Sequence, residues 1–279
     1  MTNRAEYLDT IDKKIHNGNV FVFAGVGCGL TAIGAETGGA DMIITYNTAV
    51  YRIQGVPTAM AFLPYDDCNK IAFDTAPQVL GAVKKTPVMI GIGAHDPRRS
   101  ITSMVEKAME IGVLGVTNEP FIGMYEGDLR KQMESAGLGF NKEVELIREA
   151  SQNGLITLAY VFTPEEAVKM AEAVADFIGA MVGGVTSGGP AGGAETVDLS
   201  EAISVVSEIV SALKKVGRNV PVLIHGGPLN DVEPVREVIN KTGAVGYITG
   251  STGERIPTAQ AVKEKICSFS AIRKENDPF

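Results

Sequence analysis

The 279-residue sequence contains no tryptophan and only three cysteines and three histidines. The cysteines, Cys28, Cys68 and Cys267, are odd in number and lie far apart along the chain. This pattern argues against a disulfide framework and suits a reducing compartment, so we expect a cytoplasmic protein. The histidines and cysteines are also too scattered to form a zinc-binding motif.

Basic residues are scarce as well. Lys and Arg number 25 against 33 Asp and Glu, the formal net charge is −8, and no run of five basic residues occurs. Because affinity for nucleic acid comes mainly from clustered Lys and Arg, we expect no nucleic-acid partner. No window approaches the uninterrupted apolar run of about 18 residues that a membrane span needs. Residues 1–14 also lack the apolar core of a signal peptide, so we expect no membrane association.

Apolar residues make up 45% of the sequence, and no Gly/Ser tract or Pro-rich spacer divides it. We therefore expect one domain over residues 1–279, with a large buried core. Short apolar runs alternate with segments of helical spacing roughly every 30 to 35 residues, a pattern typical of parallel βαβ units. The eight predicted strands are Val20–Ala24, Met42–Thr45, Val88–Gly91, Gly115–Thr117, Ile156–Tyr160, Phe177–Met181, Val222–His225 and Gly246–Thr249. Eight units in a chain of this length favour an α/β fold, the (β/α)8 TIM barrel.

Several helices have recognisable ends. Thr163 precedes a Pro-Glu-Glu run, which predicts a capped helix start. Ser100 is predicted to cap a helix that Gly112 ends, and Asn141 is predicted to cap one that Gly154 ends.

Residues 1–17 are predicted to form a short helix that covers the bottom of the barrel with an apolar face. The run GVGCGL at Gly25–Leu30 resembles a dinucleotide-binding turn. Its third glycine comes one position too early, and the second strand ends without an acid for a ribose hydroxyl. We therefore reject a Rossmann fold and expect no organic cofactor.

The residues just after the strand C-termini form the active-site face of a TIM barrel. Two glycine-rich turns follow the seventh and eighth strands, where barrels often bind phosphate through backbone N–H groups. The alternative is that the glycines merely allow a tight turn out of each strand. The predicted anion-binding residues are Gly25, Gly27, Gly226, Gly227, Gly250, Ser251, Thr252 and Arg255.

Other side chains at this face are candidates for chemistry. His225 and Glu119 lie at strand ends and could act as acid or base, although Glu119 would need burial to raise its pKa. Asp66 and Asp67 are candidates for a Mg²⁺ site, because Mg²⁺ prefers carboxylate and water ligands. The glycine-dense segment 183–193 is predicted to be a mobile lid, with a plain flexible loop as the alternative.

Five motifs resemble a known family. They are GGADMIITYN (38–47), LPYDDCN (63–69), GVTNEPFIGMYEGDLR (115–130), HGGP (225–228) and GSTGERIP (250–257). Over nearly the whole chain and in the same order, they resemble the phosphoenolpyruvate-hydrolase-like TIM-barrel family. That family also forms the C-terminal half of a plant tobamovirus-resistance protein, and it looks like a branch of the phosphoenolpyruvate/pyruvate barrel superfamily.

The resemblance implies an enzyme for a small anionic substrate. The expected activity is that of a hydrolase or lyase that uses Mg²⁺ to cleave a C–C or C–P bond of a 2-oxo acid related to phosphonopyruvate or phosphoenolpyruvate. Asn47 and Asn118 would orient the substrate carbonyl, and His225 or Glu119 would move the proton. The sequence departs from the family pattern at Thr117, Glu119 and Val182.

Because of these departures, the alternative is a catalytically decayed barrel that binds a ligand or a protein as a regulatory module. A homo-oligomer is expected in either case, because barrels of this size commonly self-associate.

Overall fold

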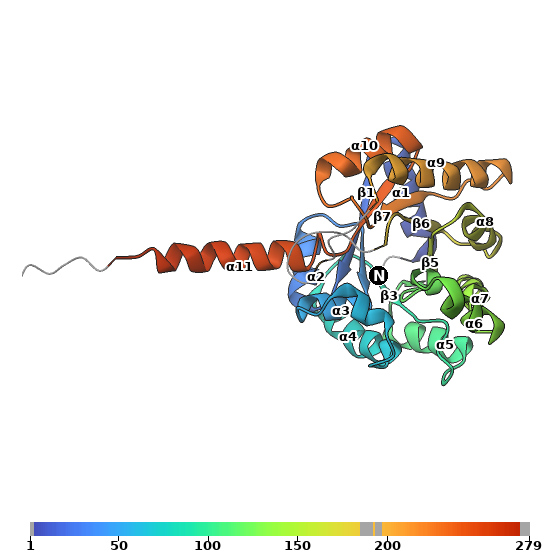
Figure 1. Cartoon of the computed structure of the whole chain (residues 1–279), viewed down its shortest axis with the longest axis horizontal. Helices are drawn as coiled ribbons and strands as arrows, with labels where there is room; N and C mark the ends of the chain where they lie inside the picture. Colours follow the sequence, from blue (N-terminus) through green and yellow to red (C-terminus); the bar gives the residue numbers. More distant parts are fainter. Residues whose placement is uncertain (1–2, 185–191, 193–196, 274–279) are drawn as a thin grey trace, which may run out of the picture.

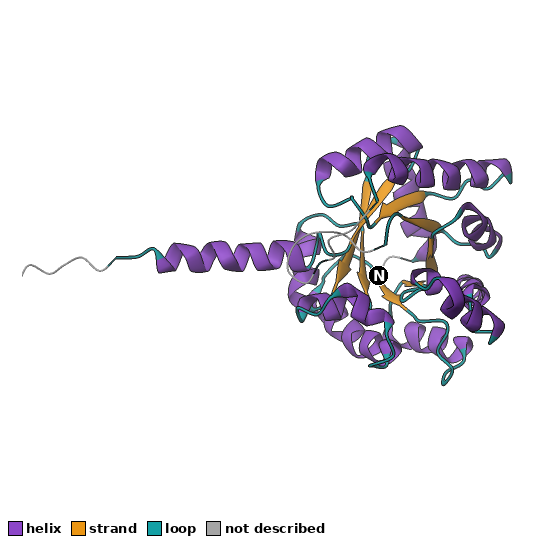
Figure 2. Cartoon of the chain, viewed as in Figure 1, coloured by secondary structure: helices purple, strands orange, loops and turns teal. Residues whose placement is uncertain are grey.

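The computed structural model describes residues 3–184, 192 and 197–273, and their strands form one closed parallel barrel in chain order. Figure 1 shows the helices around this barrel, and Figure 2 shows the strands in orange at its centre. β8 closes the ring on β1, with Gly246 aligned to Phe21. The strands are β1 (Phe21–Val26), β2 (Met42–Thr45), β3 (Val88–Gly91), β4 (Gly115–Thr117), β5 (Ile156–Val161), β6 (Phe177–Met181), β7 (Val222–His225) and β8 (Gly246–Thr249). The predicted TIM barrel is confirmed.

Helices alternate with these strands along the chain. They are α1 (Arg4–His16), α2 (Gly29–Thr37), α3 (Asn47–Ile53), α4 (Cys68–Ala82), α5 (Ile101–Ile111), α6 (Gly127–Ser135), α7 (Phe140–Gln152), α8 (Pro164–Glu172), α9 (Leu199–Lys215), α10 (Val232–Thr242) and α11 (Arg255–Ser270). Two short 3₁₀ helices, η1 (Thr58–Phe62) and η2 (Ile122–Met124), lie in the loops after β2 and β4. None of the helices in the described ranges is long and apolar enough to cross a membrane.

The predicted strand bounds are close to the observed ones, and β1 is shifted toward Val26. Ser100 and Thr163 cap their helices as predicted. The prediction for Asn141 is wrong, because α7 begins one residue earlier, at Phe140. A side-chain oxygen of Glu134 accepts the backbone N–H of Phe140 at 3.2 Å, so this donor is satisfied without a cap from Asn141.

Aromatic side chains fill the interior of the barrel near the N-terminal ends of the strands. The rings of Phe23 and Phe177 have centroids 5.2 Å apart, and Phe21 contacts both. Tyr7 and Ile11 of α1 belong to the same apolar cluster. α1 therefore covers this end of the barrel with its apolar face, as the sequence pattern predicts.

Two ion pairs hold α1 in this position. Arg4 pairs with Asp176, which directly precedes β6, and Lys14 pairs with Asp41 at 2.7 Å, directly before β2. α1 therefore lies at the N-terminal ends of the strands, and the opposite face is left for a functional site. The predicted lid, 183–193, falls mostly outside the described residues.

Phe23→Ala is expected to lower the free energy of unfolding by about 3–5 kcal/mol, because it leaves a cavity among fully buried rings. Urea denaturation followed by circular dichroism measures the change. Leu30→Ala is the control, since Leu30 is 76% exposed, and its effect should stay within about 0.5 kcal/mol. A loss below about 1 kcal/mol at Phe23 would contradict its central position in the core.

Candidate active site at the C-terminal face of the barrel

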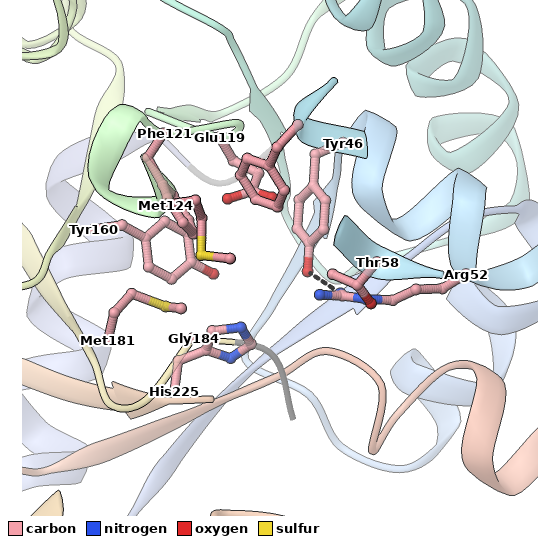
Figure 3. Close-up of a pocket in the computed structure, with 11 residues that line it drawn as sticks. Tyr46, Arg52, Thr58, Glu119, Phe121, Met124, Tyr160, Met181, Gly184 and His225 are labelled. Atoms are coloured by element: carbon pink, nitrogen blue, oxygen red, sulfur yellow. Dashed lines mark hydrogen bonds between the residues drawn. The ribbon is translucent and has the colours of Figure 1, made fainter. Parts of the chain in front are cut away.

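The C-terminal ends of the strands surround one narrow pocket (Figure 3). Aromatic and sulfur-containing side chains close part of it, and the space left is about 10 Å³, room for roughly one water molecule. Figure 3 shows the polar side chains grouped around this space. They are Tyr46, Arg52, Thr58, Glu119, Tyr160 and His225.

Three glycines at this level of the barrel make room for the larger side chains. A Cβ atom on Gly25 would lie 2.2 Å from the hydroxyl of Tyr46, and one on Gly91 would lie 2.6 Å from the Cβ of Tyr46. A Cβ atom on Gly250 would lie 2.8 Å from Nη1 of Arg52. Each distance is shorter than real carbon contacts, so the pocket needs glycine at all three positions.

Arg52 of α3 supplies a buried positive charge. Its Nε donates to Oγ1 of Thr58 at 3.1 Å, and its Nη1 lies 3.4 Å from Oε2 of Glu254 and 3.5 Å from the hydroxyl of Tyr46. Burial, the largest single cause, would lower the pKa of Arg52, but Glu254, Tyr46 and Glu119 together outweigh burial and raise it. A permanent cation in a largely dry pocket is a strong partner for an anion.

Glu119, which follows β4, is the carboxyl group that lines the pocket. It is 4% exposed, and its Oε1 accepts a hydrogen bond from the hydroxyl of Thr48 at 2.6 Å. Burial raises the pKa of Glu119 to about 7, although Thr48 and Arg52 act in the opposite direction. The predicted need for burial is thus met, and this carboxyl can take up or release a proton near neutral pH.

His225 at the end of β7 is the second titratable group that was predicted for this face. Its Nδ1 lies 2.8 Å from the carbonyl oxygen of Ile248. A carbonyl can only accept, so Nδ1 carries the proton and Nε2 is left as an acceptor. Burial lowers the pKa of His225 to about 4, and the charge of Arg52 adds to this effect. His225 is therefore neutral at pH 7.

Glu254, in the turn between β8 and α11, is completely buried. Its Oε1 has no hydrogen-bond partner among the described residues, while its Oε2 faces Arg52. Burial raises the pKa of Glu254, and Arg52 opposes that shift. No role was predicted for Arg52, Tyr46 or Glu254. The sequence did offer one signal. Tyr46 lies in the motif 38–47, Glu254 lies in the motif 250–257, and Arg52 follows the first of these motifs by five residues.

Asn47 and Asn118 are buried, but neither lines the pocket. Nδ2 of Asn47 donates to the carbonyl of Ala61 at 2.9 Å. The amide of Asn118 accepts the N–H of Tyr160 at 2.7 Å and donates to its carbonyl at 3.0 Å, and Nδ2 also donates to Glu143. Both side chains hold backbone segments together, and a role in orienting a substrate carbonyl stays a prediction.

The two glycine-rich turns do meet at the same face, since a Cβ on Gly250 would lie 2.9 Å from Cε1 of His225. One of their backbone N–H groups, however, has a partner within the protein. The N–H of Gly227 points to the carbonyl of Gly184 at 3.4 Å, and a Cβ on Gly226 would lie 2.6 Å from the same oxygen.

The hydroxyl groups after β8 are engaged in the same way. Oγ of Ser251 accepts from Nε of Arg255 at 3.1 Å, and the hydroxyl of Thr252 lies 2.9 Å from that of Tyr247. The anion site at the turns stays a prediction, and the cationic side chain that lines the pocket is Arg52. None of the eight predicted anion-binding residues lines this pocket: Gly25, Gly27, Gly226, Gly227, Gly250, Ser251, Thr252 and Arg255.

The predicted Mg²⁺ ligands also have other partners. Asp66 accepts a hydrogen bond from Tyr51, while Asp67 pairs with Arg99 at 2.6 Å and caps α4. Within the described part of the chain, no three His, Cys, Asp or Glu side chains are grouped so as to hold a metal ion. The pocket itself places one lining carboxylate beside a guanidinium. This donor set does not fit Mg²⁺, which favours several oxygen ligands.

Comparison with known proteins adds to this geometry. A sequence profile described as phosphoenolpyruvate hydrolase-like matches residues 6–272. Two proteins of Solanum lycopersicum, the ToMV resistance protein Tm-1(GCR237) and the ToMV susceptible protein tm-1(GCR26), are each 35% identical to this chain over 276 residues. The match covers 99% of this chain but 36% of each tomato protein, so the chain spans about a third of their length.

Solved structures of low sequence identity share the fold. Phosphonopyruvate hydrolase in complex with oxalate and Mg²⁺ is 15% identical, with a TM-score of 0.63 over 97% of this chain and 90% of that chain. Oxaloacetate acetylhydrolase in complex with its product oxalate is 15% identical, with a TM-score of 0.60 over 93% and 84%. The profile match and the 35% identity show more than the fold: the chain belongs to the phosphoenolpyruvate hydrolase-like family.

Proposed function

We propose that the chain is an enzyme that cleaves a C–C or C–P bond of a small 2-oxo acid, as a lyase or hydrolase. The observation that carries this proposal is the presence of Glu119 and Arg52 in one buried pocket. One is a proton-transfer group with a pKa of about 7, and the other is a fixed positive charge. The narrow space favours a compact ligand, and the two solved neighbours described above hold oxalate.

The proposed roles of these residues follow from where negative charge develops on the substrate during bond cleavage. When the bond at the carbon next to the carbonyl breaks, its electrons move onto the carbonyl oxygen and form an enolate. Arg52 supplies N–H donors and positive charge to that oxygen or to the adjacent carboxylate. Glu119, in its protonated form, then gives a proton to the enolate carbon, which yields a new 2-oxo acid. Nε2 of His225 takes up the proton that the substrate hydroxyl loses as the other fragment departs as a carbonyl compound (lyase), or the proton that water loses as its oxygen bonds to the other fragment (hydrolase).

In this proposal Arg52 takes the place that a Mg²⁺ ion was predicted to fill. The guanidinium is held by Thr58, Tyr46 and Glu254, so it is oriented before a substrate arrives. Preorganised charge of this kind needs little rearrangement during the reaction, which is why it stabilises a transition state effectively.

Glu119→Gln is expected to lower kcat/KM by about 10²–10⁴-fold, because the amide cannot give up a proton in this way. In the unaltered chain, kcat/KM should fall as the pH rises through about 7, where Glu119 loses its proton. A panel of phosphonopyruvate, oxaloacetate and related 2-oxo acids, with detection of the product acid, provides the assay. Glu110→Gln on the surface is the control. Equal turnover in the Glu119 and Glu110 variants would contradict the assignment.

Arg52→Gln is expected to lower kcat/KM by about 10²–10³-fold through loss of the buried charge. Because it also leaves Glu254 without its counter-charge, the single variant should have a lower Tm. The double variant Arg52→Gln, Glu254→Gln should regain Tm but not activity, which separates the catalytic effect from the stability effect. Treatment with EDTA should leave turnover unchanged, and a loss that added Mg²⁺ reverses would contradict the role given to Arg52.

The pH dependence of the free energy of unfolding should also reveal the raised pKa of Glu119. Its pKa of about 7 in the folded chain exceeds the ordinary 4.5, so between these values the folded chain keeps a proton that the unfolded chain releases. This contribution is fully present below pH 4.5 and is lost as the pH rises through 7. The free energy of unfolding of Glu119→Gln minus that of the unaltered chain should therefore increase by roughly 3 kcal/mol between pH 4.5 and pH 8. Urea unfolding at both pH values measures it. A difference that stays constant with pH would exclude the raised pKa.

A ligand-binding module without turnover is the second candidate. The two tomato relatives are named for a response to a virus and not for a reaction. In that case oxalate should raise the Tm of the unaltered chain but not that of the Arg52→Gln, Glu254→Gln variant, while no 2-oxo acid in the panel is consumed.

A further inference from the structure

Glu143 of α7 is a buried carboxyl group that lies outside the lining of the active-site pocket. Its side chain belongs to a residue that is only 1% exposed. Both of its oxygens accept hydrogen bonds: Oε1 from the backbone N–H of Ile122 at 2.6 Å, and Oε2 from Nδ2 of Asn118. Both donors belong to the segment that follows β4, so one carboxyl group holds this segment at two points.

The two points lie on either side of Glu119. Asn118 directly precedes Glu119, and Ile122 follows it by three residues at the start of η2. Asn118 is bound in turn to the backbone N–H and carbonyl of Tyr160 in β5. The stretch of chain that carries the pocket carboxyl is therefore tied to a helix and to a neighbouring strand before it enters the pocket and to the same helix after it.

Holding a carboxyl group at this buried position is costly. Burial raises the pKa of Glu143 to about 8, although the donors on Ile122 and Asn118 act in the opposite direction. Of the charged groups that face it, Glu166 raises the pKa and Arg130 lowers it. An apolar side chain would avoid the cost of desolvation, but it would leave two buried donors of the segment without partners. The carboxyl group is thus suited to fixing this segment.

We propose that Glu143 is a positioning residue, which holds the segment after β4 so that the carboxyl of Glu119 stays in the pocket in its hydrogen bond with Thr48. This inference rests on the proposed role of Glu119 as the proton donor. A proton donor must lie within hydrogen-bond reach of the substrate, and a displacement of about 1 Å can cost about 100-fold in rate. Glu143 does not touch the pocket, so it acts only through the segment that it holds.

Glu143→Gln tests this role, because the amide has nearly the same shape but turns an NH₂ group toward one of the two donors. We expect kcat/KM for the 2-oxo acid that is turned over to fall by about 10–100-fold. Adding Glu143→Gln to Glu119→Gln should cause no further loss, since a positioning residue acts only through its target. Glu145→Gln is the matched control on the same helix, because Glu145 is exposed and pairs with Lys142. An equal loss in both backgrounds would show an ordinary structural role and overturn the inference.

Titration of the Glu119 carboxyl provides a second measurement, which needs no substrate. In a chain with ¹³C-labelled glutamate, its NMR signal is identified by its absence in Glu119→Gln. The midpoint should lie near pH 7 in the unaltered chain and move toward 4.5 in Glu143→Gln, because a released segment exposes the carboxyl to water. An unchanged midpoint in a folded Glu143→Gln chain would contradict the inference. If the midpoint moves but no chain turns over a 2-oxo acid, the proposed function fails and the hold of Glu143 on Glu119 is supported.

Glu143→Asp is the second variant, for use where Glu143→Gln does not fold. It keeps the charge but withdraws the carboxyl group by one methylene, so the hydrogen bonds to the segment lengthen. The same drop in kcat/KM and the same direction of shift in the Glu119 midpoint are expected. A Glu143→Asp chain that matches the unaltered chain in both measurements would exclude a positioning role.

Discussion

The contact between Arg52 and Glu254 is the interaction on which the C-terminal face of the barrel depends. It joins α3 to the turn after β8, two segments that are 202 residues apart in the sequence. Each charge would be costly to bury alone, so each makes the burial of the other tolerable. The same contact explains why glycine occupies positions 25 and 250, since a side chain at either would collide with Tyr46, Glu254 or Arg52.

Burial acts on the remaining titratable groups of the pocket in one consistent way: it disfavours their charged forms. It raises the pKa of Glu119 and lowers that of His225, so that both can be neutral around the one permanent charge of Arg52. The negative charge nearest to Arg52 is that of Glu254, so an entering anion would share Arg52 with this carboxylate.

The barrel closes completely as a sheet, yet its outer layer is open beside β8. The strand ring is satisfied by hydrogen bonds between β8 and β1, whereas the outward faces of Tyr247 and Thr249 need a helix to cover them. α11, the helix that follows β8, points away from the other helices and leaves these faces partly exposed. Its connection to β8 also carries Glu254, so the position of the helix and the integrity of the pocket are physically linked.

The sequence by itself determined the strands, their order and the face at which polar groups gather, because apolar runs and turn residues reflect local burial. It also predicted Glu119 and His225 at this face, and the structure has Glu119 two residues after β4 and His225 as the last residue of β7. Only the tertiary structure decided what these groups contact. Asn118 bonds to the backbone of Tyr160 in the neighbouring strand, while Arg52 enters the pocket from a helix. Hydrogen-bond partners and desolvation depend on residues far apart in the sequence, which no local pattern contains.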